Sequence, residues 1–173
     1  KGGGFDAIIG NPPYVEYTKI KNTYTLRGFE TESCANLYAF FAERSFNMLA
    51  NASRCSMIVP ISAFANLSMS SLQKYLRGYR LVHISSFHQR PAQLFQGVLQ
   101  LLCVFILGNH QLGEFNVKTT AVNRWYSEAR EHLFNNLSFA LEPQHAKHNV
   151  LKIGTELERG ISAKFQEHQE IDK

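Results

Sequence analysis

The sequence predicts an α/β fold built on a mainly parallel sheet. Short apolar runs typical of strands, at residues 5–10, 56–61 and 81–87, alternate with helical patterns at residues 36–50 and 70–78. A further apolar run follows the third strand without an intervening helix, which suits an antiparallel last strand. With 173 residues and 45% hydrophobic composition, the chain can bury the core of one domain.

The first predicted strand ends in a rigid turn. Residues 5–10 are apolar enough for a buried strand, and Gly10 and two prolines stop the run abruptly. Pro12 forces Asn11 out of the helical region, and each proline fixes its own φ and lacks an N–H donor. The Asn11 carboxamide and the Tyr14 ring are therefore held stiffly at the carboxyl end of a strand, where open α/β sheets bind ligands.

The next two elements are a long loop and a helix. Residues 15–33 are polar and mixed in charge, without sustained periodicity, and are expected to form a loop. The helical pattern at residues 36–50 places Leu37, Phe41 and Ser45 on one apolar face, with Glu43 elsewhere.

The segments up to the last core strand complete the predicted sheet. Residues 70–73, Ser-Ser-Leu-Gln, fit a capping box that opens a short helix ending at Gly78. Residues 88–97 are expected to form a loop. The continuous apolar run at residues 99–107 predicts a strand that is central or covered on both faces.

Beyond Gly108 the patterns are weaker. Residues 115–122 predict an edge strand, residues 126–135 a helix and residues 141–153 a linker. A last helix is expected after Thr155 and Glu158, which fit a cap.

Composition excludes several classes of protein. The net charge of +4 is compatible with a polyanionic partner but too mild to establish one. Three widely spaced cysteines indicate a reduced intracellular protein rather than a disulfide scaffold. The longest apolar run is too short to span a membrane. His145 and His148 have no third ligand nearby, so no metal site is expected.

The turn after the first strand suits chemistry on a conjugated amino group. Such a nitrogen is a poor nucleophile because its lone pair is delocalised. Two acceptors aimed at its hydrogens, the Asn11 side-chain oxygen and the Pro12 carbonyl oxygen, favour a pyramidal nitrogen with a free lone pair. Tyr14 can stack on a flat substrate, and its ring face also suits a cationic methyl donor. The alternative is a plain strand-ending turn with a surface tyrosine.

With these segments the chain resembles the amino-group DNA methyltransferases, specifically adenine-N6 enzymes of the gamma-type motif order and the restriction–modification type. The resemblance runs from Phe5 to about Gly108. Its motifs are FDAIIGNPPY (5–14), NLYAFF (36–41), SMIVPIS (56–62), LVHISSF (81–87) and LFQGV (94–98). It implies a partial Rossmann-like, S-adenosylmethionine-dependent methyltransferase fold. Residues 1–110 are expected to be the C-terminal part of the catalytic domain, and residues 111–173 an edge strand, helix and linker toward a target-recognition domain.

The resemblance also implies an activity. The enzyme transfers the methyl group of S-adenosylmethionine to the N6 amino group of a flipped adenine in double-stranded DNA, within a bacterial-type, cytoplasmic restriction–modification system. In this family, Asn11 and Pro12 accept the amino hydrogens and Pro13 fixes the turn. Tyr14 and Phe95 sandwich the base, and their stacking offsets the stacking lost in the duplex.

The resemblance implies a cofactor contact, and the residues of the long loop indicate a DNA contact. Phe41, together with Asn11, is the candidate for touching S-adenosylmethionine, although a core phenylalanine explains Phe41 as well. Lys19, Lys21 and Arg27 can line a DNA groove or be solvated loop charges.

Three further expectations bear on the whole protein. The family's glycine-bearing cofactor loop does not precede Phe5, so the 173-residue chain looks like part of a longer protein and is expected to be inactive alone. An exposed sheet edge is expected to favour self-association.

Two other functions stay open. A protein-glutamine or RNA-guanine methyltransferase shares the motif from Asn11 to Tyr14, and a non-catalytic interaction module needs no polar turn.

Overall fold

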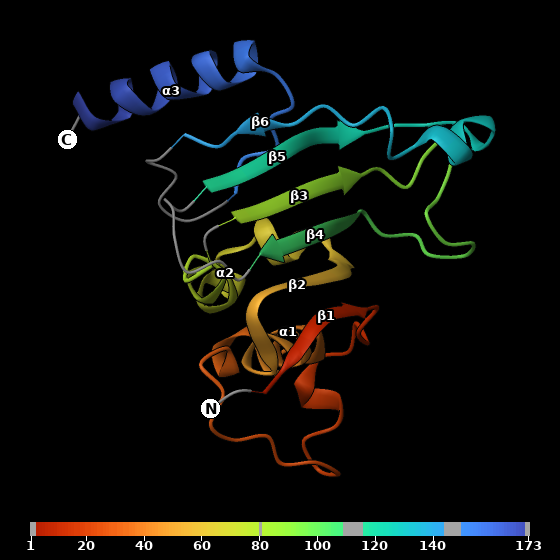
Figure 1. The fold of residues 1–173 in the computed structure, drawn as a ribbon, viewed down its shortest axis with the longest axis vertical. Helices are drawn as coiled ribbons and strands as arrows, with labels where there is room; N and C mark the ends of the chain where they lie inside the picture. The colour runs from red at the N-terminus through yellow and green to blue at the C-terminus, as the bar shows by residue number, and fades with distance from the viewer. Residues whose placement is uncertain (1–2, 80, 109–115, 144–149, 172–173) are drawn as a thin grey trace.

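A mixed sheet of six strands forms the centre of the computed structural model, which describes residues 3–79, 81–108, 116–143 and 150–171 (Figure 1). The strands, in chain order, are β1 (Phe5–Gly10), β2 (Leu49–Pro60), β3 (Leu81–Phe87), β4 (Leu102–Gly108), β5 (Asn116–Asn123) and β6 (Ala140–Leu141). The α-helices of the described residues are α1 (Leu37–Asn47), α2 (Ser70–Leu76) and α3 (Glu156–Ile171). These elements confirm the predicted α/β class.

The predicted antiparallel last strand is β4, which lies in the middle of the sheet order β1-β2-β4-β3-β5-β6. It pairs antiparallel with β2 and β3, whereas the β1–β2 and β3–β5 pairs are parallel. Leu102 at the start of β4 pairs with both Pro60 and Phe87. The carboxyl ends of β1, β2 and β3 therefore meet the amino end of β4 along one edge (Figure 1), called the carboxyl edge below.

One face of the sheet packs against α1 and α2. Strand alternation turns Met57 and Val59 of β2 into the main hydrophobic core. Phe105 of β4 packs edge-on against Phe46 of α1, with ring centroids 6.0 Å apart. The predicted strand is central, because β4 lies between β2 and β3. It is fully covered on one face only, since Ile106 points to the other face and is 45% exposed.

β1 forms as predicted, but the expectation that it is buried is wrong. Among the described residues it pairs only with β2, so its outer edge lies open. Ile9 is 85% exposed and Phe5 58% exposed, because the helices cover only the opposite face. The sheet thus has an apolar edge of the kind expected to favour self-association.

The predicted apolar face of α1 is wrong at Phe41 and at Glu43, although Ser45 is buried as expected and the helix lies close to its predicted place. Its buried side chains include Tyr38, Ala42 and Phe46, whereas Phe41 is 50% exposed. The helix is covered from two sides, by the sheet and by the loop that precedes it. Phe40 is consequently buried as well, under that loop.

The predicted capping box of α2 does not form. Ser70 is the first residue of the helix, Met69 occupies the cap position, and no side chain caps the helix. A 3-10 helix at Leu67–Met69 runs directly into α2, so a helical turn already occupies the place of a capping residue. Gln73 Nε2 instead donates to the carbonyl oxygen of Ala63 at 3.1 Å.

The C-terminal predictions have mixed outcomes. The strand expected at residues 115–122 forms as β5, but β6 pairs along its outer side, so β5 is not an edge strand. A 3-10 helix at Ser127–His132 replaces the α-helix expected at residues 126–135. The cap of α3 is confirmed: Glu158 N donates to Thr155 Oγ1 at 3.2 Å, and Thr155 N to Glu158 Oε2 at 3.0 Å.

Some predictions fall outside the described residues. The boundary near residue 110, His145 and His148 all lie in ranges that the structure does not describe. In the part that it does describe, no helix combines the length and the hydropathy needed to cross a bilayer.

Candidate active site at the carboxyl edge of the sheet

The Asn-Pro-Pro-Tyr turn follows β1 directly at the carboxyl edge. Pro12 is buried, Asn11 and Pro13 are exposed, and Tyr14 is half-buried. The successive prolines restrict the backbone and carry no N–H groups that would compete for nearby carbonyls. The Asn11 carboxamide is thus presented from a stiff turn, as the sequence predicts.

The Tyr14 hydroxyl ties this turn to the sheet. Its oxygen lies 2.9 Å from Asn11 Oδ1 and 3.0 Å from the carbonyl oxygen of Ile58 in β2, and its single proton is shared between these two acceptors. Its ring packs edge-on against Tyr38 of α1. Burial, with a smaller contribution from Cys103, raises the pKa of Tyr14 to about 12. The hydroxyl therefore stays protonated, and remains a donor, at neutral pH.

An apolar cavity of about 400 Å³ lies next to the turn, between α1 and the loop of residues 15–35. Pro13 of the turn forms part of its wall. The loop contributes Ile20, Tyr24, Leu26 and Phe29, and α1 contributes Leu37, Phe40, Phe41 and Arg44. The size is typical of a small-molecule site. Two predicted site residues, Pro13 and Phe41, thus line one cavity, whereas Asn11 does not belong to its walls.

The wall formed by the loop is anchored by Glu43, which sequence reasoning missed. This side chain is 3% exposed, and its carboxylate accepts hydrogen bonds from Glu30 N at 3.0 Å, Thr31 N at 2.8 Å and Thr31 Oγ1 at 2.8 Å. A buried carboxylate needs such partners. Ala39 and Ala42 belong to the apolar face of the helix, and Glu43 lies on the same side because it follows Ala39 by four residues. This spacing is the sequence signal that places Glu43 on the buried side.

The loop of residues 88–101 joins β3 to β4 at the same carboxyl edge and carries Phe95, which is 36% exposed. In the sheet order, β2 lies between β1 and the pair formed by β4 and β3. Residues 11–14 and Phe95 therefore leave the carboxyl edge on opposite sides of β2. The predicted pairing of Phe95 with Tyr14 on a base remains a prediction.

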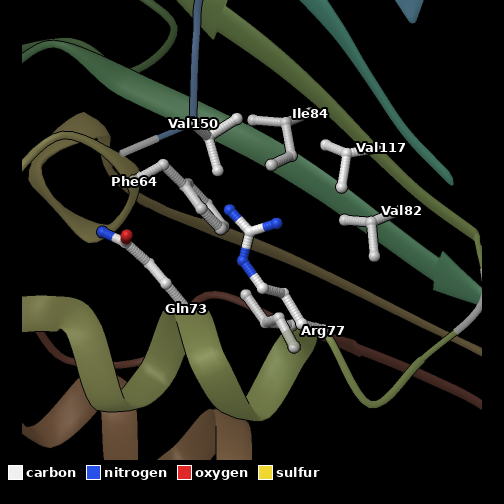
Figure 2. A pocket seen from close by; sticks show the side chains of 8 residues that line it. Phe64, Gln73, Arg77, Val82, Ile84, Val117 and Val150 are labelled. Carbon is white, nitrogen blue, oxygen red and sulfur yellow. The ribbon is translucent and has the colours of Figure 1, made fainter. Parts of the chain in front are cut away.

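A second cavity, between α2 and the sheet, is too small for a ligand. Figure 2 shows Arg77 reaching from the end of α2 toward Phe64 and the valines of the sheet. The volume is about 10 Å³, roughly the space of one water molecule. Burial raises the pKa of the nearby Glu142 carboxyl, against the opposing influence of Arg77 and Lys152. We interpret this region as part of the packing, not as a site.

The remaining candidates give no second site. Lys19, Lys21 and Arg27 are exposed on the loop that walls the larger cavity, where they face solvent. In the described ranges, no group of three or more His, Cys, Asp or Glu side chains is placed to hold a metal ion.

Comparison with known proteins identifies the family to which the chain belongs. Residues 1–95 match the family described as Eco57I restriction-modification methylase. The Type II methyltransferase M.AccI of Acinetobacter calcoaceticus is 36% identical over 76 residues, which cover 40% of this chain and 14% of that protein. The chain thus spans only a small part of this relative's length.

Solved structures share the fold. The nuclease-deletion mutant of the Type ISP restriction-modification enzyme LlaGI, in complex with a DNA substrate mimic, matches with a TM-score of 0.65 at 14% identity, covering 85% of this chain and 18% of that one. A DrdV–DNA complex matches with a TM-score of 0.62 at 17% identity, covering 83% and 18%. Since the family match spans residues 1–95 of 173, the chain belongs to the Eco57I restriction-modification methylase family.

Proposed function

We propose that the native protein carrying this sequence transfers a methyl group from S-adenosylmethionine to the N6 amino group of adenine in double-stranded DNA, within a restriction–modification system. One observation carries the proposal: Pro13, two residues from the exposed Asn11 carboxamide, lines the same apolar cavity as Phe41. A cofactor pocket and an amino-group site would then share one rigid turn.

The cavity fits the adenine end of the cofactor. Its volume of about 400 Å³ and its apolar, aromatic walls suit a flat heterocycle, and Phe41 is exposed enough to contact one. Phe41 and Pro13 would hold this end, and Asn11 would lie toward the reactive end. When bound, S-adenosylmethionine supplies an electrophilic methyl group on a sulfonium sulfur.

The residues of the turn would activate the adenine nitrogen. Asn11 Oδ1 and the Pro12 carbonyl oxygen would accept the two N6 hydrogens, which favours a pyramidal nitrogen with its lone pair available. Held by these two oxygens, the nitrogen would be ready to take the methyl group that the cofactor would supply, with the bonding pair left on the cofactor's sulfur. One N6 proton then leaves to solvent. The Tyr14 hydroxyl would keep the Asn11 oxygen in place.

Base binding would use the two aromatic residues at the carboxyl edge. Tyr14 and Phe95 would stack on opposite sides of an adenine extruded from the duplex, which is how enzymes of this chemistry reach a base inside DNA. The exposed Lys19, Lys21 and Arg27 would contribute positive charge toward the phosphates. The DNA complexes among the similar structures support a DNA substrate.

Product analysis tests this function. The native protein is incubated with isotopically labelled S-adenosylmethionine and, separately, with DNA, RNA and a release-factor peptide, and each product is digested and analysed by mass spectrometry. We expect label in N6-methyladenine from DNA alone. Label in glutamine or in RNA guanine would establish one of the alternative transferases, and no label in any substrate would favour a non-catalytic module.

A further inference from the structure

The loop that carries Phe95 is held by an arginine outside the family match. Arg130, in the 3-10 helix after β5, donates from Nη2 to the carbonyl oxygen of Gln93 at 2.7 Å and from Nη1 to that of Leu94 at 3.4 Å. The shorter contact is a strong charge-assisted bond. Both acceptors belong to the two residues directly before Phe95.

Trp125 provides a platform for this arginine. The Arg130 guanidinium carbon lies 4.8 Å from the Trp125 ring, a cation–π distance. Trp125 itself is 5% exposed and belongs to a second hydrophobic cluster with Phe87, Ala92 and Leu133. Its carbonyl oxygen also accepts the backbone N–H of Ala92 at 3.0 Å. The Arg130 guanidinium therefore rests against a buried, well-packed side chain.

We propose that Arg130 is a positioning residue that holds Phe95 for stacking on the extruded base, with Trp125 as its support. Fixing the Gln93 and Leu94 carbonyl groups restricts the backbone that leads into Phe95, so the ring needs less ordering when a base enters. This inference rests on the proposed function. It extends the site beyond residue 95 into the C-terminal part of the chain.

A double-mutant cycle in the native protein separates positioning from other roles. We measure methylation of phage DNA with Arg130→Ala, Phe95→Ala and the double variant, and Arg124→Ala serves as the control, since it removes an exposed charge of the same segment. Arg130→Ala should lower kcat roughly tenfold without changing the KM for S-adenosylmethionine. In the Phe95→Ala background the same change should cost less than about twofold.

Two outcomes of this cycle would overturn the proposal. An equal loss in both backgrounds would mean that Arg130 acts independently of Phe95, for example on a DNA phosphate. An equal loss of kcat in Arg124→Ala would mean that the loss comes from removing a positive charge of this segment and not from the contacts of Arg130.

Hydrogen exchange of the same native protein without DNA keeps this test distinct from that of the proposed function. Gly97 N donates to Gln93 Oε1 at 3.1 Å and Val98 N to the carbonyl oxygen of Phe95 at 3.3 Å, so both amides report on the loop. Arg130→Ala should speed their exchange roughly tenfold, while the amides of β4 keep the wild-type rate. Unchanged exchange would refute the positioning role even if DNA is methylated. Faster exchange in a protein that methylates no DNA would refute only the proposed function and, with it, the stacking role of Phe95.

Discussion

The Tyr14 hydroxyl donates to Asn11 Oδ1 at 2.9 Å within a four-residue turn. The carbonyl oxygen of Ile58 lies 3.0 Å from the same hydroxyl and shares its one proton, so the Tyr14 hydroxyl links the carboxamide to β2. A carboxamide oxygen accepts two hydrogen bonds, which leaves one acceptor position on Asn11 for the proposed contact with a substrate amino group. The turn is therefore held by a side-chain contact in addition to its prolines.

Replacing Tyr14 with phenylalanine should lower kcat of the native protein roughly fivefold, because a net hydrogen bond of about 1 kcal/mol that orients Asn11 is lost while the ring remains. Affinity for S-adenosylmethionine should stay unchanged. Steady-state methylation kinetics measure both, and Tyr126→Phe, at a 70% exposed tyrosine, is the matched control. A kcat equal to that of the wild type would show that the hydroxyl does not orient Asn11.

Two phenylalanines of α1, Phe41 and Phe46, should separate cofactor binding from stability in the native protein. Phe41 is 50% exposed in the large cavity, so Phe41→Ala should weaken S-adenosylmethionine binding roughly tenfold with little change in the free energy of unfolding. Phe46 is 3% exposed and does not line this cavity, and Phe46→Ala should cost about 3 kcal/mol of that free energy without weakening cofactor binding. Calorimetry and denaturant unfolding measure the two effects. Wild-type cofactor affinity in Phe41→Ala would remove this residue from the site.

Glu43→Gln should loosen the loop of residues 15–35. An amide presents an NH₂ group where the carboxylate accepted three hydrogen bonds, at a cost of about 1–3 kcal/mol. Limited trypsin digestion should then cut faster after Lys19, Lys21 and Arg27, as followed by mass spectrometry. Glu32→Gln, at an exposed glutamate, is the control. Equal digestion rates in the two variants would contradict the anchoring role of Glu43.

The 173-residue chain alone should bind S-adenosylmethionine weakly or not at all, and should transfer no methyl group. Arg44 is the one charged residue that lines the described cavity, so the charged methionine end of the cofactor meets few partners there. Titration calorimetry of this chain measures the affinity. Tight binding would mean that the chain contains a complete cofactor site.

The parts of the fold that could be predicted depend on local chemistry. β3 occupies residues 81–87 as expected, because an apolar run bounded by polar residues suffices for a core strand. The turn at residues 11–14 follows from the backbone limits of its prolines. The cap of α3 likewise needs only Thr155 and Glu158, three residues apart.

The remainder depends on contacts between distant residues. The predicted apolar face of α1 is partly wrong because a loop without periodicity covers the helix from a second side. Glu43 binds backbone groups 12 and 13 residues away, and Arg130 binds carbonyls 36 and 37 residues away. No short sequence pattern marks such partners. Both contacts hold loops of the candidate site, so its outline was predictable but its supports were not.

The proposed mechanism depends on the Asn11 carboxamide acting on the reacting nitrogen. Single-turnover methylation of DNA by the native protein with Asn11→Ala, at saturating S-adenosylmethionine and with N6-methyladenine quantified by mass spectrometry, tests it most directly. Asn51→Ala, at an exposed asparagine in β2, is the control. We predict that Asn11→Ala loses transfer at least about a hundredfold, as for one transition-state hydrogen-bonding group in other enzymes, while thermal stability and cofactor binding stay near wild type. Near-normal transfer by Asn11→Ala would contradict the account.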